Sequence, residues 1–247
     1  MRKTVILTGG CGYIGYHIVR DLLRNGKNVV IFDSLVNSTH DKFRMFRQIA
    51  ECEVYQVDVC NYKHFSSSIN SVCMSHDVEA MIHAAGYKEI GESCDSPLKY
   101  YSNNLTSCIN VAKGVVKYNI PTLIFSSSAS VYGATAAGVT EDATASLDNC
   151  QSPYACTKMM GERIFKDASK KHGFRLFNCR YFNPIGGDPR YGIETQKHNL
   201  LPALIDCARN DKKFVIYGKD YDTPDGTCIR DYILSLIHIS EPTRRTP

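Results

Sequence analysis

The glycines that follow the first apolar segment constrain this fold more than any other feature. Val5-Ile6-Leu7-Thr8 has the pattern of a short buried strand, and the run from Gly9 to Gly15 leads into a helix predicted over residues 13–25. Glycines at 9, 12 and 15 allow a sharp turn, leave room for a phosphate, and let the helix pack closely on the strand. Free N–H groups at such a helix start attract anions. The run predicts a dinucleotide site, although glycines kept only for packing give the same pattern.

A carboxylate follows the second predicted strand, residues 28–32. Asp33 lies about twenty residues beyond the glycines, where a carboxylate accepts both hydroxyls of an adenosine ribose. This favours NAD over NADP, because a 2′-phosphate would be repelled. An Asp that only caps the next turn would occupy the same place. The glycine run before it favours the cofactor interpretation.

Strand-like and helical segments alternate along the rest of the chain. Strands are predicted over 53–58, 78–85 and 121–126, and helices over 62–74, 97–118 and 153–172. Apolar strands and crossovers long enough for a helix indicate a parallel sheet covered on both faces. We therefore expect an α/β fold with a doubly wound parallel sheet of the Rossmann type, and a surface loop over 134–150. Ligands bind at the C-terminal ends of such strands.

Composition excludes several classes of protein. The 247 residues are 43% hydrophobic with a net charge of +4, which suits a sizeable core and, with scattered Lys and Arg, gives no case for nucleic acid. No segment is apolar for long enough to predict a membrane span, and the N-terminus lacks a signal peptide's apolar region. Eleven cysteines without Cys-x-x-Cys spacing indicate neither a disulfide framework nor a zinc site. We expect a cytoplasmic protein with reduced cysteines and no metal.

A tyrosine and a lysine four residues apart carry the candidate chemistry. Tyr154 and Lys158 follow Ser152-Pro153, which is a helix-start pattern, and they share one helix face. Positive charge from Lys158 and an oxidised nicotinamide would favour the phenolate, so Tyr154 can serve as a base. Ser128, at a predicted strand end, can hydrogen-bond the same substrate oxygen. The pair is common on amphipathic helices and gains weight only from the cofactor pattern upstream.

Longer segments resemble the extended short-chain dehydrogenase/reductases, and within them the UDP-glucose 4-epimerases. The resemblance runs from residue 3 to Ile233. Besides the glycine run and Asp33, it rests on Asp58-Val59, residues 85–93, 100–104, 126–133, 154–158 and 180–184, Asn199-Leu200 and residues 226–232.

This resemblance implies a redox-neutral reaction on tightly bound NAD that interconverts UDP-galactose and UDP-glucose in galactose metabolism. Tyr154 would take the proton of the sugar C4 hydroxyl while hydride passes to the nicotinamide. The 4-keto sugar would then turn over and take hydride back on its other face. The resemblance assigns Lys158 and Ser128 as catalytic partners of Tyr154, and it implies a homodimer for the full-length protein.

The resemblance also implies two sets of binding residues. The cofactor set is Gly9, Gly12, Tyr13, Ile14, Gly15, Asp33, Asn37, Ser38, Asp58, Val59, Ala85, Gly86, Lys88, Asn103, Ser126, Tyr154, Lys158 and Tyr181. The substrate set is Ser128, Tyr154, Phe182, Asn183, Asn199, Leu200, Tyr217 and Arg230. We expect an NAD-binding Rossmann domain over 1–180 and the start of a UDP-sugar substrate domain over 181–233.

Other interpretations stay open at this point. By resemblance, 4,6-dehydratases need an Asp-Glu pair where this chain has Ala129-Ser130, whereas a UDP-glucuronate decarboxylase is not excluded. An NAD-binding sensor without catalysis would lack the Tyr or the Lys, and both are present. His83 and His198 have no second ligand-type residue at metal spacing, so each is expected to be a core or surface histidine.

The last residues depart from the family pattern. From Leu234 onward the sequence resembles a translated sequencing-library adapter. We therefore expect residues 234–247 to be a non-native tail, the substrate domain to be incomplete, and the chain as printed to be impaired. Acceptance of UDP-N-acetylhexosamines and the oligomeric state are left open by the sequence.

Overall fold

The computed structural model describes residues 2–133, 138–141, 143, 146–187, 199–216 and 218–234. The chain divides into two compact units, of which the first ends at Tyr181 and the second begins at Phe182. His198, Tyr217 and residues 235–247 of the expected tail lie outside the described residues. So does part of the predicted surface loop, whose described residues include the short 3-10 helix η2 (Leu147–Asn149).

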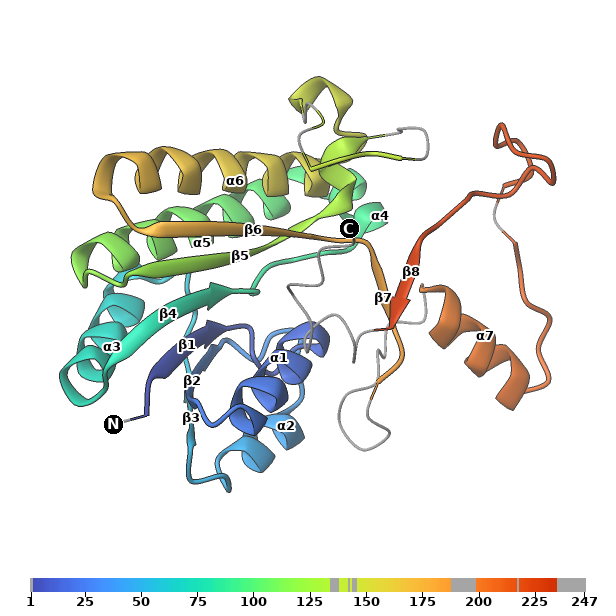
Figure 1. The fold of residues 1–247 in the computed structure, drawn as a ribbon. Helices are drawn as coiled ribbons and strands as arrows, with labels where there is room; N and C mark the ends of the chain where they lie inside the picture. Colours follow the sequence, from blue (N-terminus) through green and yellow to red (C-terminus); the bar gives the residue numbers. More distant parts are fainter. Residues whose placement is uncertain are drawn as a thin grey trace. The chain divides into compact units, whose positions relative to one another are not determined.

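The first unit is built on one parallel sheet of six strands in the order β3-β2-β1-β4-β5-β6 (Figure 1). The strands are β1 (Thr4–Thr8), β2 (Asn28–Asp33), β3 (Cys52–Gln56), β4 (Val78–His83), β5 (Thr122–Ser128) and β6 (Arg175–Tyr181). The chain moves outward from β1 to β3, then returns to β4 and moves outward on the other side. The predicted doubly wound parallel sheet is confirmed.

Helices cover both faces of this sheet (Figure 1). One face carries α1 (Tyr13–Arg24) and α2 (His40–Phe46), and the other carries α3 (Tyr62–Ser75), α5 (Pro97–Lys117) and α6 (Pro153–His172). The short helices α4 (Ile90–Asp95) and η1 (Ala129–Tyr132) follow β4 and β5. Burial on both sides explains why the strands read as continuous apolar runs.

The main core lies between the sheet and the helices α3, α5 and α6. Phe32, Met81 and Phe125 from the strands pack with Phe65 of α3 and Phe165 of α6, and each of these side chains is at most 1% exposed. Burial of such side chains contributes roughly 1.5–3 kcal/mol each. Packing in the core therefore fixes the positions of these helices on the sheet.

Several element ends differ from the sequence-based prediction. Strand β3 ends at Gln56 rather than residue 58, because the Asp58 carboxylate accepts the N–H of Cys60 (2.8 Å) and turns the chain. Strand β5 continues to Ser128 rather than 126, because β6 pairs with it as far as Ser128 and Tyr181. Helix α2 and strand β6 were not predicted.

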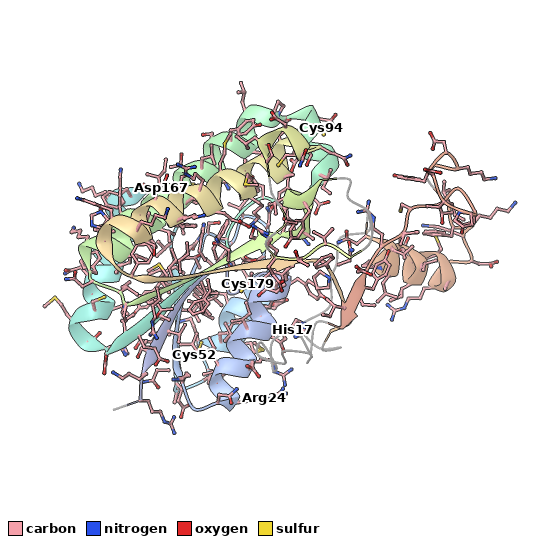
Figure 2. The ribbon with its side chains drawn as sticks, turned by 45° about the horizontal axis from the view of Figure 1, so that its top comes forward. His17, Arg24, Cys52, Cys94, Asp167 and Cys179 are labelled. Atoms are coloured by element: carbon pink, nitrogen blue, oxygen red, sulfur yellow. The ribbon has the colours of Figure 1, made fainter. Side chains whose placement is uncertain are left out.

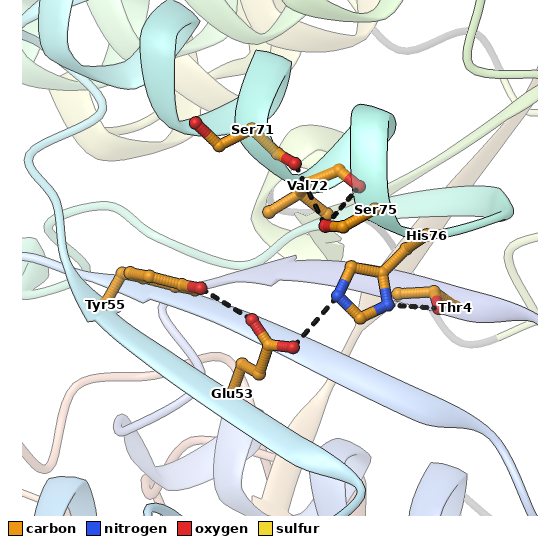
Figure 3. Close-up of polar contacts among 7 residues, drawn as sticks. All are labelled: Thr4, Glu53, Tyr55, Ser71, Val72, Ser75 and His76. Carbon is orange, nitrogen blue, oxygen red and sulfur yellow. Dashed lines mark hydrogen bonds and ion pairs between the residues drawn. The ribbon is translucent and has the colours of Figure 1, made fainter.

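A polar network joins three elements at the N-terminal end of the strands (Figure 3). Glu53 of β3 accepts from the Tyr55 hydroxyl (2.6 Å) and contacts His76 Nε2 (2.9 Å). The other ring nitrogen of His76 lies 3.4 Å from Thr4 Oγ1 of β1. The Glu53 contact raises the pKa of Tyr55 to about 12. This network ties the end of α3 to the first residue of β1 and to the edge strand β3.

All eleven cysteines lie among the described residues and are free thiols. Figure 2 shows three of them, Cys52, Cys94 and Cys179, on separate elements. Burial raises the pKa of Cys52 to about 12, so it is a thiol at neutral pH. Among the described helices, none has the length and apolar character that a membrane crossing requires.

The described residues of the second unit form a two-stranded parallel sheet and one helix. Strand β7 (Asn183–Ile185) pairs with β8 (Tyr232–Leu234), and α7 (Leu200–Arg209) lies between them in the sequence. Within the described part of this unit no side chain is buried, and Val215 and Ile216 are 58% and 59% exposed. The described residues of this unit thus lack a core.

The turn between β1 and α1 brings backbone against backbone. Gly9 has φ +77°, and a Cβ there would lie 2.7 Å from the Ala85 nitrogen. A Cβ on Gly15 would overlap the carbonyl oxygen of Gly9. A Cβ on Gly12 would meet only the Gly9 oxygen, at 3.2 Å. Gly9 and Gly15 are therefore required for packing, whereas Gly12 keeps a surface open.

Substituting Gly15→Ala should lower the free energy of unfolding by about 2–3 kcal/mol, because the added methyl group forces α1 away from the turn. The measurement is urea denaturation followed by circular dichroism. Gly91→Ala in α4 is the matched control, since nothing lies within 4 Å of its added Cβ, and it should cause no loss. Equal stability of the two variants would contradict the proposed close packing.

Candidate active site

An open cleft lies where the C-terminal ends of β1 to β4 meet. Its lining comes from four strand ends and one helix. The lining residues are Gly9, Gly12, Phe32, Asp33, Ser34, Val36, Asn37, Ser38, Val57, Asp58, Val59, Cys60, Ala84, Ala85, Gly86, Tyr87, Asn103 and Ser107. Ten of them belong to the predicted cofactor set. The cleft thus gathers residues that lie as far as 98 positions apart in the sequence, from Gly9 to Ser107.

The phosphate end of this cleft is the start of α1. Gly12 caps the helix without a side-chain hydrogen bond, and no acidic residue lies in the first turn. The N–H groups and the dipole of the helix therefore face the space left open by Gly12. Tyr13, Ile14 and Gly15 of the predicted cofactor set form this first turn. The arrangement fits a dinucleotide diphosphate.

Asp33 at the end of β2 performs two roles. Its Oδ2 accepts the N–H of Cys11 (2.9 Å), and its Oδ1 accepts the N–H of Leu35 (2.9 Å) and the hydroxyl of Ser38 (2.7 Å). The carboxylate therefore caps the following turn, as the alternative interpretation required, and it also borders the cleft. It joins the glycine turn to the β2 loop in one rigid wall that fits a ribose.

The loop after β4 is held by a buried amide. Asn104 of α5 accepts the N–H of Tyr87 (2.9 Å) and donates to the Tyr87 carbonyl (3.1 Å) and to Thr157 Oγ1 of α6 (3.1 Å). Gly86 has φ +153°, and a Cβ there would press on Asn104 Oδ1 at 3.2 Å. Asn104 thus connects the cleft wall to the helix that carries Tyr154.

The predicted catalytic residues come from β5 and α6. Ser128 ends β5, where its hydroxyl accepts from Ser130 N (3.2 Å) and Ser130 Oγ (2.9 Å). Ser152 caps α6 by accepting the N–H of Ala155 (3.2 Å), which places Tyr154 in the first turn. Lys158 Nζ donates to the Ser126 carbonyl (2.7 Å) and lies 5.8 Å from the Tyr154 ring centre.

Burial dominates the proton affinities at this site. It lowers the pKa of Lys158 to about 8. Burial also raises the pKa of Tyr154. The hydrogen bond to Ser128 lowers this pKa, whereas the negative charge of Glu89 raises it further. The expectation of a lowered tyrosine pKa is therefore not met by the protein alone. Lys158 is still largely protonated at neutral pH and supplies the positive charge next to the phenol.

His83 is a core histidine. Its Nδ1 lies 2.7 Å from Thr8 Oγ1, its Nε2 lies 3.4 Å from Ser107 Oγ, and its ring stacks on Phe125. Burial and the charge of Lys158 lower the pKa of His83 to about 3. It is neutral at physiological pH. Among the described residues, no group of three or more His, Cys, Asp or Glu side chains could hold a metal ion.

A buried ion pair fixes α6 against the end of the sheet. Glu162 accepts two hydrogen bonds from Arg180 of β6, at 3.0 and 2.8 Å, and one from Ser127 Oγ of β5, at 2.5 Å. The two charged side chains are 9% and 19% exposed, and Arg180 also lies over the Tyr132 ring. Glu162 lies one helical turn beyond Lys158, so the Glu162–Arg180 ion pair anchors the helix face that also carries Lys158.

The remaining predicted cofactor residues lie outside the cleft lining. Lys88 follows the cleft residue Tyr87, whereas Ser126, Tyr181, Tyr154 and Lys158 belong to β5, β6 and α6. Tyr181 pairs with Ser128 across the sheet, and burial raises its pKa.

The other predicted substrate residues belong to the second unit. Asn183 in β7 donates to the Asp231 carbonyl (2.8 Å). Asn199 and Leu200 begin α7, and Phe182 and Arg230 are exposed. Tyr217 lies outside the described residues.

Sequence reasoning missed part of the polar side of α5. Asn104, Ser107 and Asn110 are each at most 5% exposed and contact strand-end loops or β4. A signal was available: together with Asn103 they recur every three or four residues, which places these polar side chains on one face of the helix.

The sequence matches a known protein family and several curated proteins. The model of the NAD dependent epimerase/dehydratase family matches residues 5–235. A UDP-glucose 4-epimerase of Yersinia enterocolitica is 38% identical over 239 residues, which cover 93% of this chain and 69% of the relative. A UDP-glucose 4-epimerase of Bacillus subtilis is 36% identical, and this match covers 93% of this chain and 68% of the relative.

Solved structures are similar in fold. UDP-glucose 4-epimerase from Bifidobacterium longum in complex with NAD+ and UDP superposes with a TM-score of 0.84 at 31% identity. The enzyme from Stenotrophomonas maltophila with bound NAD and formylated UDP-arabinopyranose gives 0.85 at 32% identity. Each match covers 96% of this chain and 71% of the other.

Removing one partner of the Glu162–Arg180 pair should be costly. Arg180→Met leaves a buried carboxylate without its partner and should lower the free energy of unfolding by about 3–5 kcal/mol. The double variant Glu162→Met/Arg180→Met should recover most of that loss, because it also removes the unpaired charge. Urea denaturation of both variants and of Glu162→Met completes the cycle. Additive losses would show that the two charges do not depend on each other.

Lys158 should leave a signature in the pH dependence of stability. Below pH 8 both the folded and unfolded chains carry its proton, so folding buries the charge at full cost. Between pH 8 and the ordinary value of 10.5 only the unfolded chain keeps the proton, so stability rises with pH. Relative to Lys158→Met, the parent should gain about 3 kcal/mol across this window. Denaturation under reducing conditions tests this, and a difference independent of pH would contradict it.

Proposed function

The chain belongs to the NAD dependent epimerase/dehydratase family, and we propose that it is a UDP-glucose 4-epimerase that interconverts UDP-galactose and UDP-glucose with bound NAD. The observation that carries the proposal is the grouping of Tyr154, Lys158 and Ser128 at the ends of β5 and α6, in the unit that forms the dinucleotide cleft. Curated epimerases that are 36–38% identical over 93% of the chain support it.

The residues of the cleft fit NAD. The start of α1 at Gly12 would hold the diphosphate, Asp33 would accept the ribose hydroxyls, and Asp58 and Asn103 would line the same site. A carboxylate at position 33 disfavours a 2′-phosphate, which supports NAD over NADP. When bound, NAD supplies a reversible hydride acceptor.

The chain's own residues handle the proton. Tyr154 would take the proton of the sugar C4 hydroxyl through its phenol oxygen, and the Ser128 hydroxyl would hydrogen-bond the same substrate oxygen. The ammonium of Lys158 stabilises the phenolate, and its bond to the Ser126 carbonyl keeps it in place. Because the hydride and the proton that leave the sugar both return to it, the reaction is redox-neutral.

The UDP-sugar would be bound by side chains that were predicted from the sequence. Asn183, Asn199 and Leu200 would contact the substrate, and the Arg230 guanidinium would bind the diphosphate. A dehydratase is disfavoured, because Ala129 and Ser130 stand where an acid pair would be needed and Ser130 donates to Ser128.

Turnover by these 247 residues is expected to be slow. The described part of the second unit has no buried side chain, and its exposed apolar residues leave a sugar site open to water. Free thiols support a reducing, cytoplasmic location. Leu98 and Ile109, which are 80% and 41% exposed on one side of α5, would suit the interface of a homodimer.

The test is conversion of UDP-galactose to UDP-glucose without added NAD, read by a coupled assay that accumulates product and therefore detects slow turnover. Tyr154→Phe should lower the rate by about 10²–10⁴-fold because the general base is lost, while NAD released on denaturation stays equal to the parent's. Tyr55→Phe, on the edge strand β3 and outside the cleft lining, is the matched control and should keep the parent's rate.

Each outcome is informative. A folded, NAD-loaded parent that does not interconvert the two sugars would move the assignment to another UDP-sugar reaction or to an NAD-binding sensor. Rapid turnover by the 247 residues would overturn the expectation of impairment.

A further inference from the structure

Asn110 is a buried polar residue in the amphipathic helix α5. It lies on α5 next to Val111, which belongs to the main core and is 0% exposed, and Asn110 itself is only 4% exposed. Asparagine is a weak helix former, and a buried amide is costly unless it is hydrogen-bonded. Its presence therefore requires partners that compensate for both costs.

Both partners of Asn110 belong to the turn after β3. Its Nδ2 donates one hydrogen bond to the Val59 carbonyl (2.9 Å) and one to the Cys60 carbonyl (3.1 Å). The same turn is shaped from within by Asp58, whose carboxylate accepts the N–H of Cys60 (2.8 Å). One carboxamide thus uses both of its N–H groups to hold two successive carbonyls.

The turn held by Asn110 forms one wall of the cleft. Asp58, Val59 and Cys60 line the cleft, whereas Asn110 does not and so acts through them. In the sheet, β3 lies beyond β2 and Asp33, while β5, which carries Ser128, lies on the far side of β1 and β4. The wall is therefore on the ribose side of the cleft, away from the reacting group.

We propose that Asn110 is a positioning residue for the adenosine half of NAD, acting by holding the Val59–Cys60 turn in its binding shape before the cofactor arrives. The inference rests on the proposed NAD function of this cleft. Loops ordered in advance bind more tightly because less conformational freedom is lost on binding. Asn110 contributes this order without touching the cofactor.

The experiment measures binding of AMP and of NAD to the NAD-free chain by calorimetry, in the parent and in Asn110→Leu. AMP carries only the adenosine half, so both affinities should fall by the same factor, about tenfold, which corresponds to about 1.4 kcal/mol. Hydrogen exchange at the amides of residues 59–61 should accelerate in the ligand-free variant. Asn110→Ser keeps one hydrogen-bond donor, so its affinities should lie between those of the parent and of Asn110→Leu. It replaces Asn110→Leu in the experiment if that variant does not fold.

Val111→Ala is the matched control. It removes core packing from the same helix and should lower the melting temperature without changing either affinity. Unchanged AMP and NAD affinities in Asn110→Leu would overturn the inference and leave Asn110 with a role in folding alone, and loss of NAD affinity with AMP affinity intact would also overturn it.

Failure of the proposed function looks different. A parent that binds NAD and AMP normally but does not convert UDP-galactose would overturn the epimerase assignment and leave the inference about Asn110 intact. A parent that binds neither nucleotide would overturn both.

Discussion

The contact on which the rest of this structure depends is the backbone approach of α1 to the turn after β1. Gly15 lies so close to the Gly9 carbonyl that no side chain fits between them. Only this approach lets the N–H of Cys11 reach the Asp33 carboxylate and leaves the start of α1 open at Gly12. Glycines lose more conformational entropy on folding than other residues, and here burial of the sheet on both faces offsets that loss.

Burial also sets the chemistry of the reacting side. The same helix face carries Tyr154, Lys158 and Glu162, and each is held by a group from another strand or loop. Taking Lys158 out of water lowers its pKa to about 8, and taking Tyr154 out of water raises the pKa of the phenol. The two shifts move the phenol and the ammonium apart in proton affinity, and at neutral pH the phenol keeps its proton. A tyrosine base near neutral pH therefore needs further positive charge beside the phenol, such as that of an oxidised nicotinamide.

Elements with strong local patterns could be predicted, and those that depend on partners could not. Apolar runs and caps predicted β1, β2, α1 and the start of α6 at Pro153. Strand β6, Arg175–Tyr181, escaped prediction because it lies at the sheet edge and its exposed and part-buried residues show no apolar run. The ends of β3 and β5 were displaced by the Asp58 turn and by pairing with β6, which are tertiary effects.

By itself the sequence determined the glycine turn, the carboxylate at Asp33 and the i, i+4 pairing of Tyr154 with Lys158, because each depends on short spacing and local backbone geometry. The tertiary structure decided the direction of the two pKa shifts and the partners of Asn104 and Asn110. Burial and hydrogen bonding at these positions come from strands, loops and a helix that lie 17 to 53 residues away along the chain, and no local pattern specifies which of them will meet.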